Sequence, residues 1–221
     1  MALTKFNYNS FDVTSAASTA LGFNANANGF ATVSPGSMTL IKTLTASSSG
    51  TLSFVDGSSD VVLDNTYPVY LFKFINMHPA TDNVNFTVNF RDGGSAYDAT
   101  KTSSSFGAYH DEGDSATGVN YEGSFDLAQS TSAQILGIGG SIGNGNDESL
   151  TGTLHLFNPS STVFVKHYIS NIHFYNKDNY AINSFIAGYC NVTAAIDGVQ
   201  FAMSSGNIDA GTIKLYGLKD S

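Results

Sequence analysis

Apolar and polar residues alternate with a period of two through much of the chain. The clearest segment is residues 84–90, where valines and phenylalanines alternate with asparagines and a threonine. Since successive side chains of a β-strand point to opposite faces, this pattern predicts a strand with one buried face and one wet face. Eight further segments rich in β-branched and aromatic residues predict strands in the same way: residues 38–45, 51–55, 69–76, 153–158, 163–175, 182–189, 199–203 and 212–218.

Turn-forming residues separate the predicted strands. They gather in clusters such as DGSSD, RDGGS, HDEGD, GNGND and SSGN, and no alternation of strands with helices occurs. Only residues 125–136 could carry a helix, with Asp126 as its N-cap, and the pattern leaves helix and loop equally open. The predicted fold class is therefore an all-β, jelly-roll-like antiparallel β-sandwich with at most one short helix. A length of 221 residues suits one such domain.

The first 36 residues break this pattern. They mix isolated aromatic residues with the runs SAASTA and NANANG and show neither the strand nor the helix period. We interpret residues 1–36 as an N-terminal arm that orders against a neighbouring subunit, and residues 37–221 as the sandwich domain. A frayed terminus or a first edge strand explains the segment equally well. The candidate anchors of the arm are its aromatic side chains: Phe6, Tyr8, Phe11, Phe23 and Phe30.

The composition narrows the choice of partners. Charged residues make up only 12% of the chain, so hydroxyl and amide groups must wet its surface. Such groups suit contacts with other copies or with sugars, because they form hydrogen bonds without the desolvation cost of a charge. A net charge of −9 argues against a nucleic-acid partner. The chain lacks a long apolar run and a signal-peptide pattern, so we expect a cytosolic product without membrane insertion.

The catalytic motifs are weak. Residues 139–143, GGSIG, match the G-x-S-x-G string of a nucleophile elbow, but that elbow needs a helix after Ser141 and the following NGNDE predicts a loop. The five histidines form no zinc-binding pair, and the single cysteine, Cys190, lies in an apolar run typical of a buried thiol. We therefore assign no catalytic residue, no metal ligand and no cofactor, and expect a protein that is not an enzyme.

One acidic loop is a candidate ligand site. His110, Asp111, Glu112 and Asp114 place an imidazole and three carboxylates within five residues, and oxygen ligands at this density can hold calcium. The order does not follow an EF-hand, and an ordinary acidic loop tip is the simpler interpretation. Tyr109 precedes the loop, and a tyrosine beside polar groups could also stack on a sugar ring. The candidate ligand residues are Tyr109, His110, Asp111 and Asp114.

Several longer strings resemble a family of virion proteins encoded by marine bacteriophages, of the kind that infect cyanobacteria and other abundant ocean bacteria. They run in order from residue 50 to residue 218: GTLSFVDGSSDVVLDNTYPVYLFKF, HPATDN, HDEGDSAT, DLAQST, LFNPSSTVFVKH, AGYCN and GNIDAGTIKLYGL. The resemblance covers the chain from about Thr39 to the C-terminus and says little about residues 1–36. It implies a jelly-roll-like module of a tail fibre, head appendage or capsid decoration, usually a homo-oligomer, with a trimer favoured and no catalytic residues.

These observations lead to two hypotheses on function. The first is a structural protein of the virion, made in the host cytoplasm, whose arm or sandwich face docks onto other virion proteins of the capsid or tail. The second is a receptor-binding module that recognises a host surface glycan through the loops at residues 109–114 and 139–147. A polysaccharide-degrading enzyme is a weaker third possibility, because no convincing pair of carboxylates is present.

Overall fold

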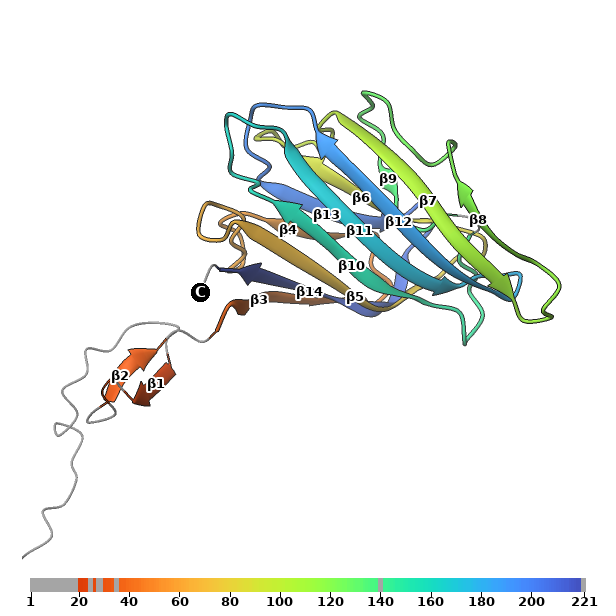
Figure 1. The fold of residues 1–221 in the computed structure, drawn as a ribbon, viewed down its shortest axis with the longest axis horizontal. Helices are drawn as coiled ribbons and strands as arrows, with labels where there is room; N and C mark the ends of the chain where they lie inside the picture. Colours follow the sequence, from red (N-terminus) through yellow and green to blue (C-terminus); the bar gives the residue numbers. More distant parts are fainter. Residues whose placement is uncertain (1–19, 24–25, 27–29, 34–35, 139–140, 220–221) are drawn as a thin grey trace, which may run out of the picture.

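The structure is a computed structural model that describes residues 20–23, 26, 30–33, 36–138 and 141–219. Within these ranges the chain forms two antiparallel β-sheets stacked as a sandwich, together with a separate two-stranded hairpin. Figure 1 shows the wide sheet in front of the narrow one. The prediction of an all-β antiparallel sandwich is confirmed.

The wide sheet has eight strands. Their order, from one edge to the other, is β3 (Met38–Thr45), β14 (Ile208–Leu218), β5 (Val69–Pro79), β10 (Leu150–Phe157), β11 (Lys166–Tyr175), β12 (Tyr180–Cys190), β7 (Lys101–Asp111) and β8 (Thr117–Tyr121). Neighbouring strands that follow each other in sequence, such as β10, β11 and β12, are joined by short connections. Strands β14 and β5 lie side by side although they are far apart in the sequence.

The narrow sheet has four strands and closes the core from the other side. Its order is β4 (Leu52–Val55), β13 (Gly198–Met203), β6 (Phe86–Arg91) and β9 (Gln134–Ile135). Phenylalanine rings from both sheets meet edge to face or stacked between the layers, with centroids about 5 to 6 Å apart. Aromatic pairs in these geometries add packing energy beyond their buried area.

The hairpin consists of β1 (Ala20–Phe23) and β2 (Phe30–Val33). Phe23 and Phe30 are cross-strand partners in its register, and their rings stack with centroids 5.3 Å apart. Both residues are exposed to solvent, Phe23 at 70% and Phe30 at 42%. Two of the five predicted arm anchors therefore lie together on one short element, while Phe6, Tyr8 and Phe11 lie outside the described residues.

All nine predicted strands are present, some of them longer than predicted. Strands β1, β2, β7, β8 and β9 were not among the nine. The helix alternative for residues 125–136 is wrong: this segment crosses between the sheets, with Ser130 bridging to Lys101 of β7 and residues 134–135 forming β9. Because its backbone groups bond to strands of both sheets, they are not available for a helix.

No helix occurs in the described part of the chain, and hence none there that is long and apolar enough to cross a membrane.

Candidate functional site

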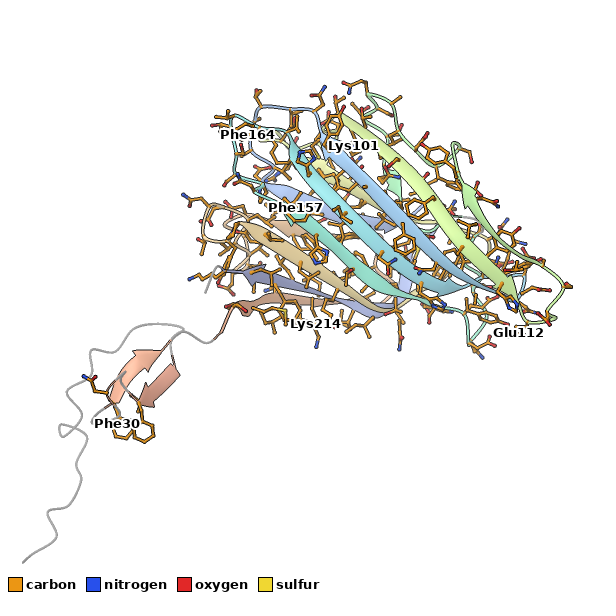
Figure 2. The ribbon with its side chains drawn as sticks, in the orientation of Figure 1. Phe30, Lys101, Glu112, Phe157, Phe164 and Lys214 are labelled. Atoms are coloured by element: carbon orange, nitrogen blue, oxygen red, sulfur yellow. The ribbon has the colours of Figure 1, made fainter. Side chains whose placement is uncertain are left out.

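One half of the wide sheet presents an outward face without formal charge. Cross-strand partners in the register share a face, so the outward residues can be followed from strand to strand. They are every second residue from Thr151 in β10, from His167 in β11, from Ala181 in β12, from Thr102 in β7 and from Thr117 in β8. None of them is Asp, Glu, Lys or Arg. We call this surface the uncharged face; Figure 2 labels one of its members, Phe157.

The uncharged face also exposes large apolar side chains. Five are prominent on its strands: Val119 (74% exposed), Tyr121 (62%), Ile169 (50%), Phe106 (47%) and Phe185 (37%). Tyr121, Phe106 and Phe185 are consecutive partners across β8, β7 and β12, so they form a row perpendicular to the strands. The rings of Phe106 and Phe185 are nearly parallel, at 9°, with centroids 5.0 Å apart.

Two hollows flank the Phe106–Phe185 pair. The first has a volume of about 470 Å³ and lies over Ser104, Ala187 and Gly188, with His167, Ile169 and Tyr189 at its rim. The second, of about 450 Å³, lies over Ala108 and Ala181, with Val119, His173 and Asn183 around it. The hollows arise because small outward residues stand on both sides of the aromatic row. The surface thus combines a projecting ridge with two recesses.

Histidine is the only titratable cation on this face. His155 is half-buried in β10, and burial lowers its pKa below the ordinary value of about 6.5, so its imidazole stays neutral at pH 7. Formal charges reappear in the other half of the sheet, where Lys73 and Lys214 are cross-strand partners on the same outward side. Two carboxylates of neighbouring loops contact the face, since Asp114 lies against His110 and Asp126 accepts a hydrogen bond from Tyr121.

Of the four predicted ligand residues, Tyr109 and His110 line the second hollow, whereas Asp111 and Asp114 do not. Tyr109 points to the inner side of the sheet, where its ring meets Tyr180 edge to face at 5.9 Å and packs against the core. His110 points outward, with its Nε2 3.2 Å from Asp114 Oδ1. Asp111 closes the turn by accepting hydrogen bonds from the Ser115 hydroxyl and backbone, and these bonds lower its pKa.

Calcium is expected to leave the thermal stability of this protein unchanged at millimolar concentration. Asp111, the best-placed carboxylate of the loop, already accepts three hydrogen bonds from Ser115 and Ala116. In the described ranges no three His, Cys, Asp or Glu side chains lie close enough to hold a metal ion. Thermal unfolding with calcium and with EDTA tests this. A saturable rise in Tm that Asp111→Asn removes would contradict it.

The two candidate nucleophiles lack the surroundings of a catalytic group. Ile142, directly after Ser141, pairs with Val84 in an isolated bridge, and the residues that follow form a loop rather than a helix. Residues 139–140 lie outside the described part. Cys190 is fully buried, as the sequence predicts, and burial raises the pKa of its thiol to about 12. Neither group is positioned as an elbow serine or a thiolate.

The uncharged face was not predicted as a site. A signal for it exists in the sequence: in residues 163–175 and 182–189 the outward positions include Ile169 and Phe185, so the side of these strands expected to be wet is itself partly apolar. These apolar residues form one continuous surface only because strand pairing brings them side by side, and the sequence alone does not give that pairing.

Comparison with protein families, with curated proteins and with solved structures finds no match for this chain.

Proposed function

We propose that this chain is a non-enzymatic structural protein of a bacteriophage particle, which acts by self-assembly and by docking onto other virion proteins of the capsid or tail. The observation that carries the proposal is the uncharged face, with its exposed ridge of Tyr121, Phe106 and Phe185. A contiguous apolar patch on the outside of a sheet is typical of surfaces that bind other proteins.

The distribution of charge supports an assembling protein over an enzyme. Catalytic sites concentrate titratable groups with perturbed pKa values in a cleft. Here the largest pKa shifts belong to groups buried in the sandwich, such as Tyr70 and Tyr168, whose pKa values are raised by burial. The hollows of the outward face contain no carboxylate. Such a surface suits binding rather than acid–base chemistry.

The virion setting rests on the resemblance of the chain, from about Thr39 to the C-terminus, to marine phage structural proteins. That family implies a location in the particle after synthesis in the host cytoplasm. The recognition of a host glycan through the loops at 109–114 and 139–147 stays an alternative, and Tyr109 and His110 of the first loop both line the second hollow. Neither role requires nucleic acid or a membrane as partner.

A chain that lacks residues 2–35 is expected to stay folded and to lose incorporation into particles by about tenfold or more, which corresponds to roughly 1.4 kcal/mol of binding. The deletion removes the aromatic anchors of the arm, including Phe23 and Phe30, and leaves strands β3 to β14 intact. Far-ultraviolet circular dichroism reports the fold, and quantitative immunoblots of purified particles report incorporation.

The matched control for this deletion is the full chain with Phe164→Ser. Phe164 is an exposed aromatic residue in the connection before β11, so its loss removes an aromatic side chain without touching the arm (Figure 2). The control is expected to be incorporated normally. Normal incorporation of the deleted chain would show that residues 1–36 are not the attachment arm.

A further inference from the structure

We infer that the uncharged face is the surface through which two copies of this chain bind each other, face to face about a two-fold axis near β12. This inference deepens the proposed function, because it rests on its self-assembly component and names the partner as a second copy. It is carried by the charge, the shape and the size of the face, which are independent of one another.

The charge of the chain restricts where two copies can meet. Each copy carries a net charge of −9, so two copies repel each other over most approaches. The uncharged face has no Asp, Glu, Lys or Arg at an outward strand position, and the carboxylates that contact it, Asp114 at His110 and Asp126 at Tyr121, belong to loops beyond β7 and β8, so the centres of two such faces can meet without desolvating an ion. Depletion of charged residues with enrichment of aromatic ones is typical of the centre of protein interfaces.

The position of the axis keeps the lysines out of the contact. β12 is the middle strand of the five, and Phe185 lies near its centre. When the two-fold axis runs along β12, between the two faces, β8 of one copy lies over β10 of the other. Lys73 in β5 and Lys214 in β14 then remain outside the contact, in the half of the sheet that stays exposed.

The shape of the face is self-complementary. In a two-fold contact, each copy must offer both the projecting group and the recess that accepts it. The Phe106–Phe185 pair is the projecting group, and the hollows over Ser104 and Ala187 and over Ala108 and Ala181 are the recesses. With the axis along β12, the Phe106 and Tyr121 rings of one copy project over β11 and β10 of the other copy, beside its own ridge and hollows.

The size of the face matches a stable interface. Five strands at a spacing of about 4.8 Å and with a mean length of roughly 30 Å cover about 700 Å² of flat surface. Standard protein interfaces bury about 800 Å² on each partner. Side-chain relief adds to the flat area, so the uncharged face alone supplies what a specific dimer needs.

The same observations favour a protein over a sugar as the occupant. A sugar presents hydroxyl groups around its ring, and buried hydroxyls require hydrogen-bond partners. Phe106, Phe185, Ile169 and Val119 offer none, and the hydroxyl of Tyr121 already donates to Asp126. An apolar aromatic ridge is stabilised when another apolar surface covers it and removes it from water.

The test is the oligomeric state of the full chain and of Phe185→Asp, measured by sedimentation velocity from about 1 to 100 µM, a range that covers moderate affinities. The wild-type chain is expected to sediment as a dimer. The variant is expected to raise the dissociation constant by about 30-fold or more, the effect of disrupting a central interface residue. Its far-ultraviolet spectrum should stay unchanged, because Phe185 points outward.

The matched control is Ile75→Asp. Ile75 is also on the outward side of the wide sheet, on β5, and is 39% exposed against 37% for Phe185, but it lies outside the uncharged face. This variant should remain a dimer. If both variants dissociate equally, or if the wild-type chain is a monomer throughout, the inference is wrong. A trimer would overturn the two-fold arrangement.

A second variant covers the case in which Phe185→Asp does not fold. Ala187→Cys adds a small thiol close to the axis, while the native Cys190 is buried and does not compete. A short bis-maleimide is expected to join two copies of this variant, and a lack of cross-linked dimer would overturn the inference. A monomer that binds host polysaccharide only with Phe185 intact would assign the face to a glycan instead.

These outcomes are separable from those of the arm deletion. The deletion removes residues 2–35 and leaves the uncharged face in place, so a chain without its arm should still form dimers in solution. Dimers that fail to enter particles would leave this inference standing and count against the arm. If the chain is a monomer in solution but enters particles only with its arm, the arm assignment stands and the dimer inference is wrong.

Discussion

Phe201→Ala is expected to lower the free energy of unfolding by about 3–5 kcal/mol, the range found when a buried phenylalanine is truncated in a packed core. Phe201 lies on β13, in the middle of the narrow sheet's contact with the wide sheet, and is fully buried. Its ring centroid is 5.1 Å from that of Phe74, 5.3 Å from Phe72, 5.7 Å from Phe86 and 6.3 Å from Phe54.

The reason for the large effect is that Phe201 joins the two layers. Phe72 and Phe74 belong to β5 of the wide sheet, whereas Phe54 and Phe86 belong to β4 and β6 of the narrow sheet. Removing the central ring leaves a cavity bordered by four rigid rings, which cannot all collapse into it. The chain also has no disulfide to offset the loss, since its single cysteine is free.

Chemical denaturation followed by circular dichroism measures this loss. The control is Phe164→Ala, which removes the same side chain from an exposed position and is expected to change stability by less than about 0.5 kcal/mol. A loss below about 1 kcal/mol for Phe201→Ala would mean that the two sheets are not held together by this aromatic cluster.

Much of the fold can be predicted from the sequence because buried apolar residues, such as those of this cluster, recur at every second position of a strand. Phe86, Val88 and Phe90 are all buried in β6, and the period-two pattern marks them without any knowledge of their partners. The pattern works wherever the inward side of a strand is filled by large apolar residues. That condition holds for strands such as β4, β6, β11 and β13, and less for β3, of which only Ile41 and Leu44 pack against the core.

Strand β7 escapes prediction because its inward positions are not filled in this way. Lys101, Ser105 and Gly107 are buried there, and each is polar or small. Ser105 donates its hydroxyl to Glu122 O, and a Cβ at Gly107 would lie 2.9 Å from Asn183 O, so larger apolar side chains do not fit. The requirement for small residues comes from the neighbouring segments, which local periodicity does not register.

The candidate site depends even more on tertiary placement. Tyr121 and Phe185 are 64 residues apart in the sequence, and only the pairing of β8 with β7 and of β7 with β12 brings them into one row. The acidic loop shows the converse. Tyr109 and His110 are adjacent in the sequence, yet they lie on opposite sides of the sheet because side chains alternate along a strand.

Lys101→Met is expected to destabilise the protein by about 2–4 kcal/mol at pH 7, since it leaves buried acceptors without a donor. Lys101 on β7 is fully buried, and its ammonium donates to Asn89 Oδ1 at 2.5 Å and to Ala99 O at 2.7 Å. It stands in a row with Cys190 and Lys166 on three adjacent strands. The ammonium of Lys166 is likewise bound by loop carbonyls.

The role of this lysine is to fix the ends of strands where apolar packing stops. Methionine has nearly the same length, so the variant keeps the volume and isolates the effect of the lost hydrogen bonds. Lys73→Met is the control, because Lys73 is exposed on the outward side of β5 and its loss should change stability by less than about 0.5 kcal/mol. Chemical denaturation at pH 7 compares the two.

The pH dependence of the unfolding free energy separates the effect of the Lys101 ammonium from the effect of its side-chain packing. Burial lowers the pKa of Lys101 to about 8, whereas an unfolded lysine titrates near 10.5. Between these values the unfolded chain holds the proton and the folded chain does not, so the wild-type unfolding free energy should rise from about pH 8 to about pH 10.5. Lys101→Met must lose this component of the rise while Lys73→Met keeps it. Equal pH profiles for both variants would show that the buried Lys101 does not titrate as its surroundings require.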